Sequence, residues 1–138
     1  MSKTKRLMKS MLGLPGWVQA WIAILFGTNM MSFAFTSTPE GWWIAIAFAA
    51  IASINMPTMV MQGGMTRFLS LPHFIWLPLV IYLYGQLYGA TPLPDGNHRS
   101  FVTAIFTLNT VSLLFDVLEA YRWLSGRREI LGLARRRA

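Results

Sequence analysis

Four long stretches of the chain consist mostly of apolar residues, and short polar segments separate them. These stretches are residues 17–36, 42–61, 71–90 and 101–124. A helix of about twenty residues crosses the roughly 30 Å hydrocarbon core of a bilayer, so each stretch has the length of a membrane span. Backbone groups in lipid must bond to one another, and the apolar residues do not alternate with polar ones, so helices are expected. The pattern predicts an all-α fold, an integral membrane four-helix bundle.

The composition is typical of a membrane protein, and residues 1–138 leave room for a single membrane domain. Charged residues make up 12% of the chain and apolar residues 54%, whereas soluble domains carry about a quarter charged residues. A surface so poor in charge is hard to keep in water. The chain has no cysteine, which excludes disulfides, thiolate metal sites and cysteine nucleophiles.

The basic residues are distributed unequally between the two sides of the predicted membrane. Eleven of the twelve Lys and Arg residues fall on one side, and Arg99 falls on the other. Positively charged loops stay on the cytoplasmic side, so we expect both termini and the loop with Arg67 in the cytoplasm. The aromatic residues expected at the interfaces are Trp17, Tyr121 and Trp123 inside and Trp42, Trp43 and Tyr88 outside. Short loops and arginine-rich ends make a bacterial inner (cytoplasmic) membrane the simplest setting.

The two basic tails, residues 1–15 and 125–138, contain apolar residues among their charges. Each tail is expected either as a short amphipathic helix on the inner leaflet or as a solvated disordered segment. The residues expected to contact anionic lipid headgroups are Lys3, Lys5, Arg6, Lys9, Arg127, Arg128, Arg135, Arg136 and Arg137. A nucleic-acid partner is not expected, because the charges lie at the ends of the chain and not on a folded face.

Polar and small residues inside the spans predict how the helices associate. At 1.5 Å per residue, Asn29 and Asn109 both lie roughly 18 Å above the inner interface. We therefore expect an interhelical polar contact between the first and fourth spans. Gly85 and Gly89 form a GxxxG pair, which predicts a helix-packing seam, either within the chain or between copies.

A polar stripe runs along the last span. Asn109, Ser112, Asp116 and Glu119 are spaced three, four and three residues apart, which places them on one helix face. A continuous polar stripe on a membrane helix is expected to face the interior of the protein. Asp116 lies roughly 8 to 10 Å inside the cytoplasmic edge by the same counting.

Together with polar residues of other spans, this stripe forms a candidate vestibule open to the cytoplasm. Its members are Asn55, His73, Asp116 and Glu119. In one interpretation Asp116 takes up a proton or cation. A charge within a span costs on the order of 3 kcal/mol, so an ionisable residue there is first interpreted as functional. In the other, the same residues form salt bridges at the inner rim, with Glu119 bound to Arg122 and Asp116 bound to His73 or Arg67.

Few residues of the sequence could serve as ligands for a metal or a cofactor. The methionines that suit Cu(I) are Met30, Met31, Met56, Met59, Met61 and Met65, but methionine usually serves as a flexible packing residue. His73 alone is near a span, while His98 is assigned to the outer loop with Asp95. No metal, haem or other cofactor is expected, and no Ser/His/Asp arrangement or phosphate-binding motif is recognisable.

Three classes of function remain. The preferred one is a non-catalytic accessory or assembly subunit of a membrane complex, or a protein that associates with itself. The second is a small oligomeric transporter or channel for a proton, cation or small molecule. In size and span count the chain resembles small multidrug-resistance transporters, which depend on a carboxylate in the first span, whereas residues 17–36 contain no acid. The third is a lipid-modifying enzyme that uses the cytoplasmic carboxylates.

Overall fold

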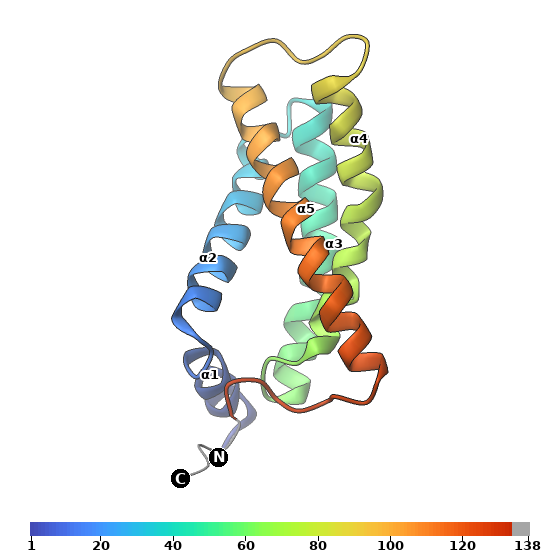
Figure 1. Cartoon of the computed structure of the whole chain (residues 1–138). Coiled ribbons are helices and arrows are strands. Elements are labelled where there is room, and N and C mark those ends of the chain that lie inside the picture. Colours follow the sequence, from blue (N-terminus) through green and yellow to red (C-terminus); the bar gives the residue numbers. More distant parts are fainter. Residues whose placement is uncertain (134–138) are drawn as a thin grey trace.

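The computed structural model describes residues 1–133, and this part of the chain is helical and contains no strand, which confirms the all-α prediction. Its α-helices are α1 (Lys3–Leu12), α2 (Gly16–Met30), α3 (Pro39–Gln62), α4 (Trp76–Tyr88) and α5 (Asn97–Leu124). Its 3₁₀ helices are η1 (Met31–Ala34), η2 (Arg67–Ser70) and η3 (Pro72–Ile75). Figure 1 shows α2 to α5 running lengthwise, with α1 at the end where the chain begins.

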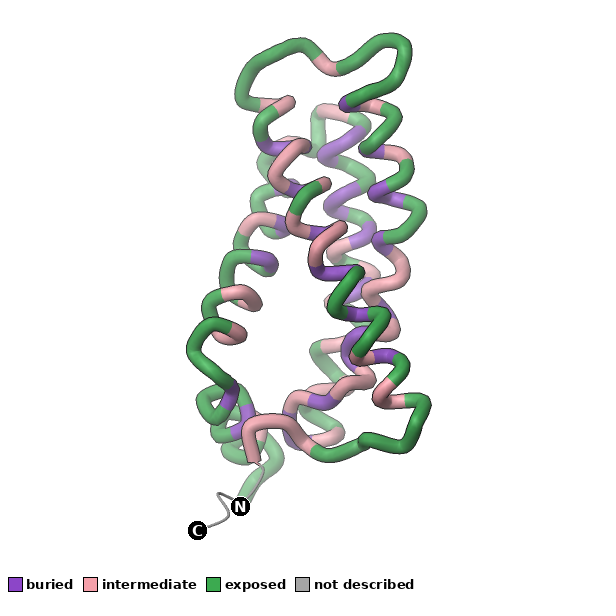
Figure 2. The backbone as a smooth tube through the Cα atoms, viewed as in Figure 1, coloured by how far each residue is buried: buried purple, intermediate pink, exposed green. Residues whose placement is uncertain are grey.

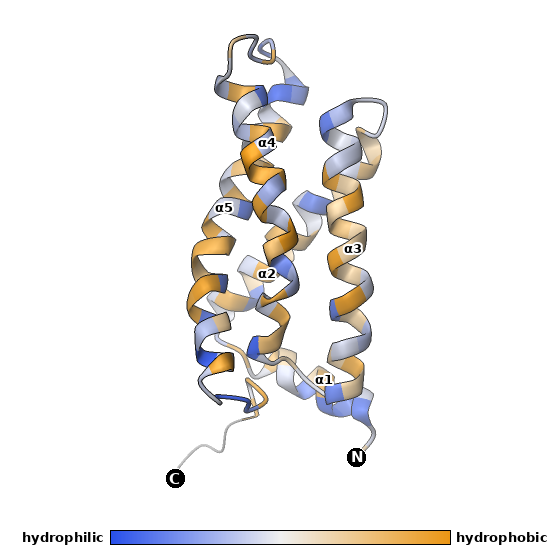
Figure 3. Cartoon of the chain, turned by 90° about the vertical axis from the view of Figure 1, so that its right-hand side faces the viewer, coloured by the Kyte–Doolittle hydropathy of each residue, from blue (hydrophilic) through white to orange (hydrophobic). Residues whose placement is uncertain are grey.

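Three segments are long and apolar enough to cross a membrane, namely Pro39–Gln62, Arg67–Tyr88 and Asn97–Leu124. A fourth is added if Lys3–Leu12 and Gly16–Ala34, which meet at a bend of 108°, count as one span. In Figure 3 hydrophobic colour dominates the middle of the long helices, and hydrophilic colour gathers toward their ends. This distribution matches a slab of hydrocarbon between two aqueous layers.

Local sequence explains where α3 begins and ends. The Thr38 hydroxyl accepts a hydrogen bond from the Gly41 amide, and Pro39 occupies the first turn, where a missing amide hydrogen costs nothing. The helix stops at Gly63, whose φ of 67° is left-handed and therefore favours glycine. These signals give α3 the sharpest boundaries of the spans.

The third apolar stretch differs from the continuous helix expected over residues 71–90. It begins with η2 and η3, and the regular α-helix covers only Trp76–Tyr88. Pro72 donates no backbone hydrogen bond and its ring crowds the carbonyl of the preceding turn, which explains the interruption, while Leu71 itself keeps helical backbone angles. Pro78 lies in the first turn of α4, where proline is tolerated.

The buried apolar cluster is built mainly by α3, α4 and α5. α4 and α5 share the most extensive helix contact. The fully buried members of the cluster are Ile44, Leu83, Leu87, Val102 and Ile105. Among the described residues of α2, only Leu25 joins this cluster. Figure 2 accordingly shows α2 largely exposed, while buried residues follow the facing sides of the other helices. Apolar packing therefore holds α2 less firmly than its neighbours.

The segment after α5 folds back against α1, so the helical tail that was one of two expectations for residues 125–138 is not found at residues 125–133. The Ser10 hydroxyl donates to the Leu131 carbonyl at 2.6 Å and accepts from the Met65 amide at 2.9 Å. The Leu131 amide donates to the Met65 carbonyl at 2.8 Å. We call Ser10, Met65 and Leu131 the terminal clasp, because they join the first helix, the loop after α3 and the last described segment.

Glycines make the terminal clasp possible. A Cβ atom added to Gly13 would lie 2.0 Å from the Gly132 carbonyl oxygen, and one added to Gly64 would lie 2.2 Å from the Ile130 side chain. Gly132 itself has a left-handed φ of 74°. The close backbone approach between α1 and the last segment therefore requires residues without side chains.

We expect Gly13→Ala to open the terminal clasp, because the new methyl group would collide with the backbone of Gly132. A loss of about 1.4 kcal/mol of local stability raises the open population, and hence tryptic cleavage after Arg127 or Arg128, about tenfold. The released peptide can be quantified by mass spectrometry. Gly16→Ala is the matched control, because a Cβ atom there meets nothing within 4 Å. Equal cleavage rates in the two variants would contradict the steric argument.

Candidate functional site

Asn29 and Asn109 face each other in the interior and join α2 to α5. Asn29 Nδ2 donates to Asn109 Oδ1 at 2.9 Å, and Asn109 Nδ2 donates back to Asn29 Oδ1 at 3.1 Å. Asn29 Nδ2 also donates to the Leu25 carbonyl at 2.9 Å. Both side chains are fully buried. The pair therefore supplies its own hydrogen bonds in a place that water does not reach.

About two turns further along the polar stripe, Asp116 meets His73 from η3. Asp116 Oδ1 lies 3.1 Å from His73 Nδ1, and the Ser112 hydroxyl donates to Asp116 Oδ2 at 3.3 Å. Asp116 is buried, and the His73 ring stacks on Trp76 with 4.6 Å between the ring centroids. This arrangement orients the imidazole and gives the carboxylate two partners, which a buried charge requires.

Glu119 belongs to a separate cluster closer to the surface. It forms ion pairs with Arg67 at 2.9 Å and with Arg122 at 2.5 Å, and Arg67 also pairs with Glu129 beyond the end of α5. Arg67 therefore binds Glu119 and Glu129 and not Asp116. Three of the four residues of the candidate vestibule are thus divided between the His73–Asp116 pair and this rim network, which contains Glu119.

Asn55 does not join either group. Its Nδ2 donates to the Leu69 carbonyl at 3.0 Å, which ties α3 to η2. Its Oδ1 is buried and has no hydrogen-bond partner within the described chain. Asn55 and His73 both line a cavity of about 160 Å³ between α2 and α3.

A second carboxylate–imidazole pair, with a buried carboxylate and a half-buried imidazole, lies at the opposite end of the helices, although a loop position was expected for His98. His98 occupies the first turn of α5, and its Nε2 lies 3.1 Å from Oε2 of the buried Glu40 in the first turn of α3. Its ring lies beside Phe35, which stacks on Phe101 at 4.4 Å. The sequence contained one signal for this pair, because both residues lie at the starts of helices that are predicted to begin on the same side of the membrane.

The glycine seam does not pack against another helix of the described chain. Gly85 is exposed, and a Cβ atom placed there meets nothing within 4 Å. Gly89 follows the last residue of α4 and has an extended backbone, so the two glycines do not share one continuous helical face. Packing between helices of one chain is therefore not the role of this seam, and contact between copies stays a prediction.

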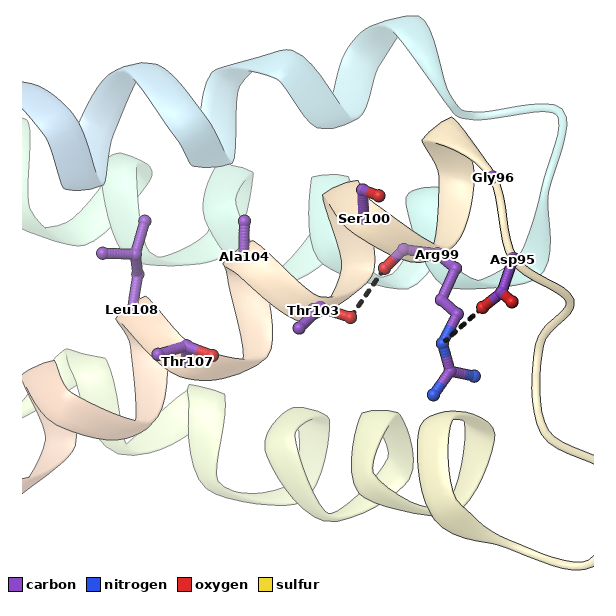
Figure 4. A pocket seen from close by; sticks show the side chains of 8 residues that line it. All are labelled: Asp95, Gly96, Arg99, Ser100, Thr103, Ala104, Thr107 and Leu108. Atoms are coloured by element: carbon purple, nitrogen blue, oxygen red, sulfur yellow. Dashed lines mark hydrogen bonds and ion pairs between the residues drawn. The ribbon is translucent and has the colours of Figure 1, made fainter.

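A shallow hollow of about 660 Å³ lies on the N-terminal half of α5 and the loop before it. Its lining comes from one stretch of the chain, Asp95, Gly96, Arg99, Ser100, Thr103, Ala104, Thr107 and Leu108. Figure 4 shows Arg99 reaching from α5 toward Asp95. Arg99 also donates to the carbonyls of Leu93 at 2.6 Å and Leu87 at 3.2 Å, which caps the end of α4. The floor of the hollow is formed by small side chains.

The basic residues expected at the lipid headgroups are exposed where the structure describes them, namely Lys3, Lys5, Arg6, Lys9, Arg127 and Arg128. Arg135, Arg136 and Arg137 lie outside the described residues. Across residues 1–133, no group of three His, Cys, Asp or Glu side chains is placed to hold a metal ion.

We expect the Asn29–Asn109 pair to show strong thermodynamic coupling. Asn29→Leu or Asn109→Leu leaves one buried amide unpaired and lowers the free energy of unfolding by about 1–3 kcal/mol. The double variant should lose less free energy of unfolding than the two single variants lose together, with a coupling energy of about 1 kcal/mol. Unfolding in mixed micelles with a denaturing detergent measures both quantities.

Ser53→Ala and Thr58→Ala are suitable controls for this cycle. Their hydroxyls bond only to carbonyls of their own helix at exposed positions, so removing them should change little. Strictly additive effects of the two asparagine substitutions would contradict a direct interhelical contact.

Acidification is expected to weaken the attachment of residues 129–133, because it protonates the Glu129 carboxylate that binds Arg67. The pKa of Glu129 lies below its ordinary value of 4.5, because its own backbone amide and then the Arg67 side chain donate hydrogen bonds to its carboxylate. A lowered folded-state pKa contributes stability above pH 4.5 that is lost as the pH falls through the folded value. The protection factor of the Leu131 amide, corrected for intrinsic exchange, should therefore fall below pH 4.5. In Glu129→Gln, the protection factor of the Leu131 amide should not show this decrease below pH 4.5.

Known proteins offer no relative from which the role of these residues can be transferred. The chain matches no family model, no curated protein and no solved structure. The geometry provides two part-buried carboxylate–imidazole pairs, one buried amide pair, a cavity and an open hollow on α5.

Proposed function

We propose that the chain forms a four-helix bundle in a bacterial inner membrane, with both termini in the cytoplasm. Two features support this orientation. The described basic residues other than Arg99 lie at the end that holds α1, the loop after α3 and the end of α5 (Figure 1). Exposed aromatic side chains occur toward both ends, including Trp17 and Tyr121 at one and Trp42 and Tyr88 at the other.

Within that membrane, the chain acts as a non-catalytic accessory subunit that assembles with copies of itself or with a larger membrane complex. The observation that carries this proposal is the hollow on α5. Its floor consists of Ser100, Thr103, Ala104 and Thr107, and no other helix of the described chain contributes to its lining. A second small-residue surface, at Gly85 on α4, is equally uncovered.

The physics of helix association in lipid explains why this observation matters. Lipid tails are as apolar as leucine, so two helices gain little from burying apolar surface against each other. They associate where small side chains allow the backbones to approach closely and where hydroxyls bond across the interface. Thr103 and Thr107 on α5 supply such hydroxyls, although Thr103 already donates to the Arg99 carbonyl at 2.8 Å.

The second candidate is a transporter or channel for a proton, cation or small molecule, and the His73–Asp116 pair favours it. Asp116 is buried within a span with the His73 imidazole at 3.1 Å, and buried ionisable groups in spans often mark ion pathways. The same pair also fits a structural role at the inner rim. The fully buried Asn29–Asn109 pair lies above it on the same face of α5, so a path to the outer side would have to pass these two amides.

Association through α5 predicts a specific cross-linking pattern, which is simple to test in a chain that has no cysteine. Thr107→Cys should form a disulfide with a second copy or with a co-purifying subunit. Ile24→Cys should not, although Ile24 is 54% exposed on α2. Ala104→Leu and Gly85→Leu fill the small-residue surfaces and should weaken association about tenfold or more by sedimentation in detergent.

Asp116→Asn separates the two candidate functions. If assembly is the role, this variant should keep the same partners and the same cellular activity as the unaltered chain. If activity disappears while abundance and assembly are unchanged, the transporter hypothesis replaces the accessory one. A chain that stays monomeric and co-purifies with no other protein would also contradict the accessory role.

A further inference from the structure

The cavity between α2 and α3 contains polar atoms that the hydrogen bonds of the chain leave unused. It measures about 160 Å³, and its walls are mostly apolar side chains from α2 and α3, including Phe26, Phe48 and Met56. Phe26 is 44% exposed and Met56 is 51% exposed. Since both lie on helices that contact lipid in the proposed orientation, a molecule dissolved in the bilayer can reach the cavity from the side.

One unused polar atom is the indole Nε1–H of Trp76, and another is Oδ1 of Asn55. Trp76 is only 3% exposed, and its indole nitrogen has no acceptor among the described residues. Asn55 Oδ1 is buried and has no donor. Both residues line the cavity. A buried donor and a buried acceptor without partners are unfavourable, which points to a ligand or water that supplies both.

These two groups are held in place without any ligand. The Trp76 ring stacks on His73 with an angle of 5° between the ring planes, and His73 is itself anchored by Asp116. Asn55 is oriented by the bond from its Nδ2 to the Leu69 carbonyl at 3.0 Å. A preorganised donor and acceptor bind a matching group with little further loss of entropy.

A hydroxyl group is the smallest match, because it accepts one hydrogen bond and donates another. The size of the cavity indicates what carries this hydroxyl, since an engineered apolar protein cavity of about 150 Å³ binds benzene. We propose that the cavity binds the ring of a membrane-dissolved phenol. The phenol oxygen accepts from Trp76 Nε1–H, its hydrogen is donated to Asn55 Oδ1, and the ring lies among the aromatic and methionine side chains. This site does not depend on which partner the chain assembles with.

The experiment titrates the full chain in detergent with 4-fluorophenol and follows binding by fluorine NMR, with empty micelles subtracted. One saturable site is expected, with an affinity about tenfold higher than for fluorobenzene, which has the ring but not the hydroxyl. For 4-fluoroanisole, which keeps the acceptor but has no hydrogen to donate, an intermediate affinity is expected. This ligand series needs no altered protein.

Trp76→Phe tests the assigned donor. The variant should lose most of the preference for 4-fluorophenol over fluorobenzene while still binding fluorobenzene. Trp43→Phe is the matched control, because Trp43 is 52% exposed at the start of α3 and does not line the cavity, and it should behave like the unaltered chain.

Three results would overturn the proposal. Equal affinity for 4-fluorophenol and fluorobenzene would describe a plain apolar void. Absence of saturable binding above the micelle background would assign the polar atoms to water. A preference for the phenol that survives in Trp76→Phe would place the hydroxyl elsewhere. If Trp76→Phe does not fold, the three-ligand comparison on the unaltered chain decides the question.

Discussion

The reciprocal amide pair between Asn29 and Asn109 is the constraint on which the position of α2 depends. In lipid an unpaired amide finds no water, so each of these side chains needs the other. The neighbouring helices α3, α4 and α5 share a continuous apolar cluster, to which α2 adds only Leu25 among the described residues. The two hydrogen bonds therefore favour one depth and one rotation of α2 relative to α5, and the edge contact of Trp21 with Phe115 adds to them.

Below that pair, charged groups are arranged so that each acid is matched. Asp116 has His73 and Ser112, and Glu119 has Arg67 and Arg122. At the other end Glu40 has His98. This matching explains how Glu40, Asp116 and Glu119 are kept buried or half-buried in an apolar protein, because a buried charge without a partner would be strongly destabilising.

Elements that depend on local pattern could be predicted from the sequence, and contacts between distant segments mostly could not. Uncharged stretches locate the spanning helices, and counting 1.5 Å per residue brings Asn29 and Asn109 to one level, where the structure has them paired. The Glu40–His98 contact was missed because each residue has a local explanation, Glu40 as an acid at a helix start and His98 as a loop residue. The sequence contains no signal for the bonds of Ser10 to Leu131 and Met65 except nearby glycines, and glycine occurs in many other structural settings.

The terminal clasp has a consequence for the order of events during synthesis. Ser10 and Leu131 are 121 positions apart, so their contact forms only after the last span has left the ribosome. Until then α1 is held only by its contacts with α3 and by the bond from the Met65 amide to Ser10, and in the proposed orientation its exposed basic face is available to the inner leaflet. Docking of this segment thus follows the synthesis of α5, and a truncated product that lacks the segment would leave the buried Ser10 hydroxyl without its acceptor.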